Sequence, residues 1–99
     1  MMRLLLLAVL LLGSPAAAQD RAAFAQQAQR CSELGGEALC RAALDQSHRL
    51  KNWAEARKLW RCYSAVLAAE AEMIAASFAS GQSVAVATAW QEMATSCRP

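Results

Sequence analysis

The sequence NWAEARKLWRCYSAVLAAEAEMIAASFASG, residues 52–81, decides the fold that we predict. Asn52 followed by Glu55 is typical of a helix N-terminus, where an Asn side chain and an acid three residues later satisfy free backbone N–H groups. Ser80-Gly81 is a suitable end, because glycine adopts a positive φ at little cost. We therefore expect one long helix from Asn52 to Gly81, with shorter helices packed against it.

Two apolar stripes run along this segment at spacings of three and four residues. One consists of Trp53, Ala56, Trp60, Tyr63, Leu67 and Ile74, interrupted by Glu70, and the other of Leu59, Cys62, Val66, Ala69, Met73 and Ala76. Residues at these spacings share one face of a helix. Together the stripes form an apolar sector wider than a helix resting on a surface requires. This width predicts neighbours on two sides of the helix.

Three shorter helices are predicted around this segment. The first spans about 21–34 and ends at Gly35-Gly36, the second spans about 37–50, and the fourth begins near Ser83 as its cap. Their expected core faces are Phe24, Ala28, Cys31 and Leu34; Leu39, Cys40, Ala43, Leu44, Ser47 and Leu50; and Val86, Trp90, Met93 and Cys97. The predicted fold class is all-α, a small four-helix bundle stabilised by disulfides.

Residues 1–18 have the organisation of a cleaved secretory signal peptide. Arg3 precedes an unbroken apolar run from Leu4 to Leu12, and three alanines, residues 16–18, precede the expected cleavage site. The apolar run is shorter than the roughly 20 residues that span a membrane, so we predict no transmembrane anchor. The mature chain, residues 19–99, is then a single domain of 81 residues that is periplasmic or secreted.

The charge balance of this mature chain argues against a nucleic-acid partner. It contains nine Lys and Arg residues and eight Asp and Glu residues. Proteins that bind nucleic acids neutralise phosphates with a strongly basic surface, which this balance does not supply. The hydrophobic core of so short a domain gives little stability by itself, so we expect covalent cross-links.

Four cysteines in the mature chain provide candidates for these cross-links: Cys31, Cys40, Cys62 and Cys97. An even number in an oxidising compartment is typical of disulfides, and the spacings are not those of metal or redox sites. We therefore expect no metal and no cofactor. We prefer the pairs Cys40–Cys62 and Cys31–Cys97, which tie every helix into one closed unit. The pairs Cys31–Cys40 and Cys62–Cys97 remain open, because both schemes are symmetric about predicted turns.

A basic segment around the start of the long helix is the candidate contact surface. Its residues are Arg49, Lys51, Trp53, Arg57, Lys58 and Arg61. These cations form either a solvated face or a docking surface for an acidic partner or lipid headgroups. The tryptophans Trp53, Trp60 and Trp90 either pack in the core or anchor a partner, and Trp53 is the expected anchor.

Three functions are compatible with these features. The first, which we favour, is a small exported binding protein that has no catalysis of its own and acts on another exported protein. The second is a carrier of a small apolar ligand or lipid, which requires a cavity lined by Trp, Met and Val. The third is an enzyme that uses Asp45 and His48, three residues apart on one helix. That pair has no nucleophile beside it, so we predict no catalytic residues.

Overall fold

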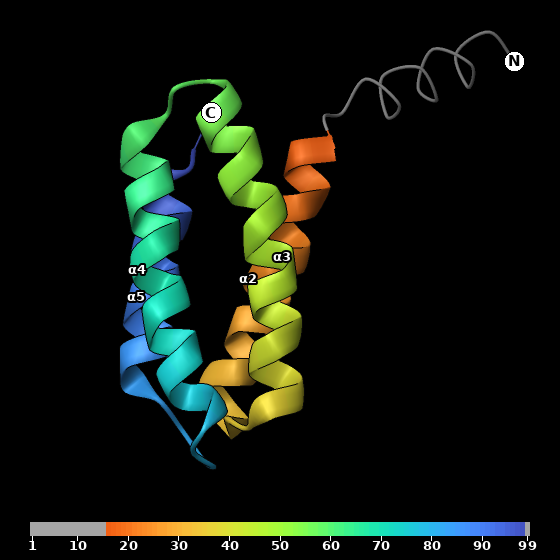
Figure 1. The fold of residues 1–99 in the computed structure, drawn as a ribbon, viewed down its shortest axis with the longest axis vertical. Helices are drawn as coiled ribbons and strands as arrows, with labels where there is room; N and C mark the ends of the chain where they lie inside the picture. The colour runs from red at the N-terminus through yellow and green to blue at the C-terminus, as the bar shows by residue number, and fades with distance from the viewer. Residues whose placement is uncertain (1–15, 99) are drawn as a thin grey trace, which may run out of the picture.

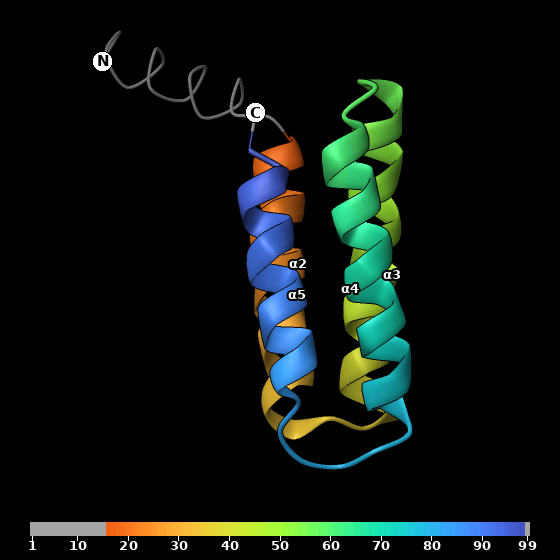
Figure 2. The ribbon, with the colours of Figure 1, turned by 90° about the vertical axis from the view of Figure 1, so that its left-hand side faces the viewer.

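Four helices, each antiparallel to the next, form the described part of the protein (Figure 1). The computed structural model describes residues 16–98. The helices are α2 (Ala16–Leu34), α3 (Glu37–Ala56), α4 (Trp60–Ser77) and α5 (Val84–Ser96). Each packs on the next, and α5 returns to α2, so that the bundle is closed (Figure 2). The predicted all-α, four-helix, disulfide-stabilised class is confirmed.

The described residues bear only in part on the predicted leader and anchor. The signal peptide predicted at residues 1–18 lies outside the described residues, apart from Ala16, Ala17 and Ala18 at the start of α2. Among residues 16–98, none of the helices combines the length and the apolar character needed to cross a membrane.

One stripe from each helix forms the core, and most of its side chains are small. The largest fully buried side chains are Phe24, Leu50, Met73 and Met93, and the rest are mainly Ala, Val and Cys. Small side chains let helices approach closely but bury little apolar area. A core of this kind gives little stability by itself, so we expect the two disulfides to contribute strongly to the stability of the fold. The predicted core residue Leu34 is instead exposed, because it is the last residue of α2.

The predicted helix start at Asn52 is wrong. Asn52 lies inside α3, which continues to Ala56. The reason is that Leu50 and Ala54 extend the buried stripe of α3 at the spacing of a helix face, and both are fully buried. Burial of this stripe outweighs the capping preference of one Asn, which contributes only about 1 kcal/mol.

The chain reverses at residues 57–59 instead. Lys58 has a φ of 57°, the left-handed conformation. The Leu59 N–H donates to the Ala54 carbonyl at 2.9 Å, and the Lys58 N–H donates to the Glu55 carbonyl at 3.0 Å. These two bonds form a Schellman motif, in which glycine usually occupies the left-handed position. The turn escapes prediction because a lysine occupies that position.

At the opposite end of the bundle, the α2–α3 turn pairs with the α4–α5 loop. The Gly36 N–H donates to the Ala79 carbonyl at 2.8 Å, and the Gly81 N–H donates to the Leu34 carbonyl at 2.9 Å. A Cβ on Gly35 would lie 2.9 Å from the carbonyl oxygens of Ala79 and Gly81. We call this part of the molecule, residues 34–36 and 79–83, the glycine end.

The structure confirms Ser83 as the cap of α5 and corrects the end of α4. The Ser83 Oγ accepts a hydrogen bond from the Val86 N–H at 3.2 Å. Helix α4 ends at Ser77, before the Ser80-Gly81 stop that the sequence predicts. Gly81 does adopt a positive φ, of 95°, but it does so within the loop.

The disulfides join Cys31 to Cys40 and Cys62 to Cys97, so the preferred pairing is wrong and the alternative is found. The error follows from the displaced turn. Cys40 lies in the first turn of α3 and Cys62 in the first turn of α4. The first turns of two consecutive antiparallel helices lie at opposite ends of a bundle, which keeps Cys40 and Cys62 apart. One disulfide therefore lies near the glycine end and the other near the α3–α4 turn.

Candidate functional site

The α3–α4 turn gathers several cations around one tryptophan. Arg57 and Lys58 form the turn, and Arg61 follows in the first turn of α4. Trp53 lies one turn before Arg57 on α3, and Arg21 approaches it from α2. We call these five residues, Arg21, Trp53, Arg57, Lys58 and Arg61, the basic end. Sequence reasoning missed Arg21, because no local pattern relates it to a tryptophan on another helix.

Trp53 is half-buried between two guanidinium groups. The Arg21 Cζ lies 5.6 Å and the Arg57 Cζ 5.1 Å from the centroid of its ring. Cation–π contacts of this kind contribute about 0.5–1 kcal/mol each at exposed positions. Arg21 Nη1 also donates to the Cys97 carbonyl at 3.0 Å. Trp53 therefore organises the arginines and is not the freely exposed anchor that we expected.

The cations of the basic end have no carboxylate partners in the described part of the chain. The ion pairs found there join Arg41 to Glu37, and Lys51 and His48 to Glu70. A guanidinium has five N–H donors in a rigid fork that matches carboxylate and phosphate groups. Arg57, Lys58 and Arg61 are exposed, so most of their donors face solvent.

Two of the predicted contact residues lie elsewhere. Lys51 points towards α4, where its Nζ lies 3.0 Å from Glu70 Oε1, and its side chain is only 19% exposed. Arg49 is exposed on α3 but is two helical turns from Arg57. The structure thus brings Trp53, Arg57, Lys58 and Arg61 together and leaves Arg49 and Lys51 outside this group.

Glu70 is the centre of a buried polar cluster between α3 and α4. Its Oε1 accepts from Lys51, and its Oε2 lies 2.5 Å from the Ser47 hydroxyl, which donates to it. Ser47 is fully buried and Glu70 is 7% exposed. A buried carboxylate that is paired and hydrogen-bonded avoids the large cost of an uncompensated charge. This cluster explains the one polar interruption of an apolar stripe as a link between two helices.

The Asp45–His48 pair that we considered for catalysis is not joined in the described structure. His48 Nδ1 lies 3.8 Å from Glu70 Oε2, and both Asp45 and His48 are exposed. The nearby hydroxyl of Ser47 has no access to solvent. A nucleophile has to reach its substrate, so this arrangement lacks a site for nucleophilic catalysis. Residues 16–98 also contain no cluster of His, Cys, Asp and Glu that could hold a metal ion.

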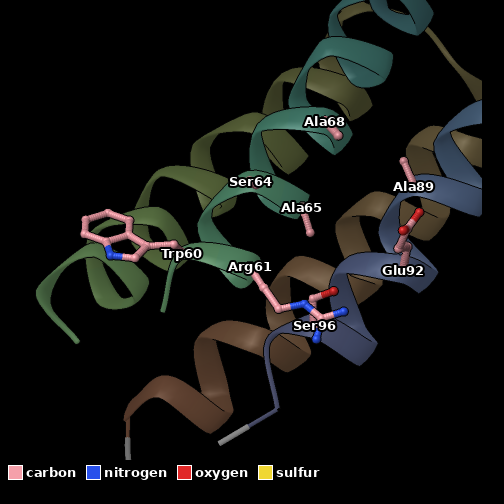
Figure 3. Close-up of a pocket in the computed structure, with 8 residues that line it drawn as sticks. All are labelled: Trp60, Arg61, Ser64, Ala65, Ala68, Ala89, Glu92 and Ser96. Carbon is pink, nitrogen blue, oxygen red and sulfur yellow. The ribbon is translucent and has the colours of Figure 1, made fainter. Parts of the chain in front are cut away.

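A groove of about 500 Å³ lies between α4 and α5 (Figure 3). It is lined by Trp60, Arg61, Ser64, Ala65, Ala68, Ala89, Glu92 and Ser96. Arg61 reaches across it towards Ser96, whereas the Trp60 ring points away from α5 (Figure 3). The groove is open and carries two charged residues. It is not the cavity lined by Trp, Met and Val that a carrier of apolar ligands requires, because Met73, Met93 and Val86 are buried in the core.

The outward surface of α4 is apolar and uncovered. We call it the α4 outer face, and it comprises Trp60, Ser64, Leu67, Ala71, Ile74 and Phe78, all exposed. The exposed fractions of its large side chains are 55% for Trp60, 43% for Leu67, 50% for Ile74 and 88% for Phe78. As the sequence predicts, α4 has neighbours on two sides, α3 and α5, but within residues 16–98 they cover mainly the stripe from Leu59 to Ala76. A contiguous apolar surface of this kind is unusual on a monomer and marks an interaction site.

Comparisons of the chain with protein families, with curated proteins and with solved structures find no match. The function is therefore argued from the chemistry of the basic end, the groove and the α4 outer face.

Proposed function

We propose that the protein is a small exported binding protein without catalysis of its own, and that its basic end binds an acidic surface of another exported protein. The observation that carries this proposal is the set of cations around Trp53 that lack carboxylate partners within residues 21–98. Export is supported by the leader-like residues 1–18 and by two disulfides, which persist in oxidising compartments.

The order of the basic end favours binding over simple solvation. Contact with Trp53 restricts the Arg21 and Arg57 side chains, and a restricted side chain loses less entropy when it binds a carboxylate. Bidentate pairs between arginine and carboxylate are among the strongest polar contacts in proteins. These features match an acidic protein surface with carboxylates in fixed positions.

The backbone at Lys58 supports the same proposal. Lys58 adopts a left-handed conformation that costs an L-residue about 1–2 kcal/mol and glycine very little. Strained residues of this kind concentrate at functional sites. A cation that is retained where glycine would be more stable is consistent with a role in binding.

The carrier and enzyme hypotheses remain predictions with weaker support. The open groove between α4 and α5 lacks the apolar lining of a carrier. The enzyme hypothesis lacks a joined Asp45–His48 pair and an accessible nucleophile. We therefore propose neither as the function.

The experiment is affinity capture from the exported fraction of the host, with the tagged and fully oxidised protein as bait. The test variant combines Arg57→Glu with Lys58→Glu, and both residues are exposed. The matched control combines Arg30→Glu with Arg41→Glu, which reverses the same charge at exposed positions nearer the glycine end. Circular dichroism confirms that both variants are folded.

We expect the wild type and the control to recover one acidic protein and the Arg57/Lys58 variant to lose it. Higher salt should weaken the capture, because the contacts are between charges near the surface. Equal recovery by the wild type and the Arg57/Lys58 variant would show that the basic end is not the contact.

A further inference from the structure

We infer that the protein forms a homodimer in which two α4 outer faces pack against each other in antiparallel orientation. This inference concerns a different face, which shares only the flanking Arg61 with the basic end, and it does not depend on the function proposed above. Its basis is the spacing, the size pattern and the charge pattern of exposed residues on α4.

The α4 outer face has the spacing of a coiled-coil seam. Its six residues follow one another at intervals of four, three, four, three and four. Apolar residues at alternating intervals of three and four form the contact line of one helix with another. Here every residue of the line is exposed, and none is charged. The line extends over nearly all of α4, so it has the length of a complete helix–helix contact.

A second copy in antiparallel orientation complements this line in size. In that orientation, residues at equal distances from the middle of α4 lie opposite each other in the two copies. Leu67 then lies opposite Ala71, and Ile74 opposite Ser64, so each large side chain meets a small one. Large side chains opposite small ones let two helices interdigitate closely. At each end, Trp60 of one copy meets Phe78 of the other, and aromatic pairs of this kind add stability beyond the area that they bury.

A parallel arrangement lacks this fit. It places each residue opposite itself, so that Trp60 meets Trp60, while Ser64 meets Ser64 and leaves a gap. The size pattern therefore favours the antiparallel dimer. It also favours a second copy of this chain as the partner. When the same line of residues runs in the opposite direction, each of the large residues Leu67 and Ile74 faces a small one.

Charges beside the line favour the same arrangement. Arg61 and Glu72 lie three helical turns apart, on the side of α4 that faces α5. In the antiparallel dimer, Arg61 of each copy lies beside the half of α4 that carries Glu72 in the other copy. A parallel dimer would instead place the flanks that carry Arg61 and Glu72 in the two copies on opposite sides of the contact, so that these charges could not pair. Opposite charges at the rim steer association and select its orientation.

The exposed area has the size found in weak, transient dimers. At about 200 Å² for each fully exposed large side chain, the four exposed fractions correspond to on the order of 450 Å² of apolar surface per copy. A standard interface buries about 800 Å² per partner. The exposed Ala68, Ala71 and Ala75 and the flanking residues contribute further area. Because this contact is at the low end of specific interfaces, we expect a weak dimer whose population depends on concentration.

Sedimentation velocity and light scattering on the oxidised protein test this inference. Over concentrations from about 1 µM to about 1 mM, we expect the mass to rise from one copy to two. Ala71→Glu introduces a charge near the two-fold axis without removing a large side chain. It should weaken the dimer about 100-fold or more, because like charges meet in an apolar contact.

Ala94→Glu is the matched control, since Ala94 is exposed on α5 and away from the α4 outer face. It should dimerise like the wild type. Leu67→Glu is a second test variant, and circular dichroism with urea titration verifies that each variant is folded. The Arg57/Lys58 double variant should still dimerise, so that failure of the proposed function and failure of this inference give different results.

Cross-linking tests the orientation. Ser64→Cys and Ile74→Cys are prepared separately, with the native disulfides formed, and are treated with a short bismaleimide either alone or mixed. In the antiparallel dimer, two Ser64 positions are about 15 Å apart along the helices, beyond the reach of the reagent, whereas Ser64 lies opposite Ile74. We expect cross-linked dimer only in the mixture.

Three results would overturn the inference. A mass of one copy at about 1 mM would show that this face does not pair with a second copy and is left for another occupant. A dimer that persists in both Ala71→Glu and Leu67→Glu would place the contact on another surface. Cross-linking of each single variant with itself would overturn the antiparallel arrangement.

Discussion

Removal of the Cys62–Cys97 disulfide is expected to destabilise the protein more than removal of Cys31–Cys40. The two bonds join residues 35 and 9 positions apart in the sequence. A disulfide stabilises a protein mainly by restricting its unfolded chain, and the effect grows with the logarithm of the loop length. For these loops the stabilisation is about 4 kcal/mol for Cys62–Cys97 and about 2.7 kcal/mol for Cys31–Cys40.

The contacts around each disulfide increase this difference. Near Cys31–Cys40, backbone hydrogen bonds hold the glycine end together after the disulfide is removed, including Gly36 to Ala79 and Gly81 to Leu34. Near Cys62–Cys97, the Arg21 hydrogen bond to the Cys97 carbonyl is the polar contact that still ties the end of α5 to another helix in residues 21–98. All four cysteines are almost completely buried, so the packing lost on substitution is similar for the two pairs.

The assay compares two double variants, Cys31→Ala with Cys40→Ala and Cys62→Ala with Cys97→Ala, by urea and thermal unfolding. For a domain of this size, 1 kcal/mol shifts Tm by about 4–8 °C. We expect losses of roughly 15–30 °C for the Cys62/Cys97 variant and roughly 10–20 °C for the Cys31/Cys40 variant. The m-value should rise in both, because the unfolded chain expands when a cross-link is removed.

An equal loss in the two variants, or a larger loss in the Cys31/Cys40 variant, would refute this reasoning. It would mean that native contacts at the disulfides, and not loop entropy, dominate their contribution. If the Cys62/Cys97 variant is unfolded in buffer, titration with trimethylamine N-oxide restores the folded state, and extrapolation to zero osmolyte allows the comparison.

Three substitutions test other parts of the structure. Gly35→Ala should destabilise the protein by about 2 kcal/mol or more in urea unfolding, because Gly35 has a positive φ and an added Cβ would contact the backbone of Ala79. Gly36→Ala should destabilise it less, because the space around a Cβ at that position is open. Lys58→Gly should stabilise the protein by about 1 kcal/mol, seen as a higher Tm, and should weaken partner capture; an unchanged Tm would contradict the assignment of strain to Lys58. Glu70→Gln should lower the free energy of unfolding by about 1–2 kcal/mol, because it removes the charge paired with the largely buried Lys51, and a change no larger than that of Glu72→Gln would contradict the role of this cluster.

Local sequence signals predict several elements of the fold correctly. The apolar spacing of each segment predicts a helix, and all four helices are present. Gly35-Gly36 predicts the first turn, and Ser83 predicts the start of α5. These predictions succeed because a positive φ at glycine and a capping hydroxyl depend only on neighbouring residues.

The position of the α3–α4 turn is not available from such signals. Asn52 is a good cap in isolation, whereas Lys58 is a poor residue for a left-handed turn. The outcome depends on Leu50 and Ala54, which continue α3 into the core. Because this turn sets the height of every residue on α4, its displacement also makes the preferred disulfide pairing wrong.

The candidate surfaces are predicted only in part. Sequence reasoning identifies Trp53, Arg57, Lys58 and Arg61, but the approach of Arg21 depends on how α2 packs against α3. The sequence shows the α4 outer face only in part, because just three of its six residues, Trp60, Leu67 and Ile74, belong to one half of the wide apolar sector. Which half the chain covers depends on the rotation of α4 about its own axis, and that rotation is set by contacts with three other helices.

The amino-acid sequence by itself determined that this protein is helical and that its cysteines form disulfides. Periodicity, chain length and residue chemistry are properties of the chain that do not require knowledge of its neighbours in space. Only the tertiary structure decided which cysteines pair, which cations surround Trp53 and which stripe of α4 stays uncovered. Each of these depends on contacts between residues far apart in the sequence, and such contacts are selected by the burial of the whole core.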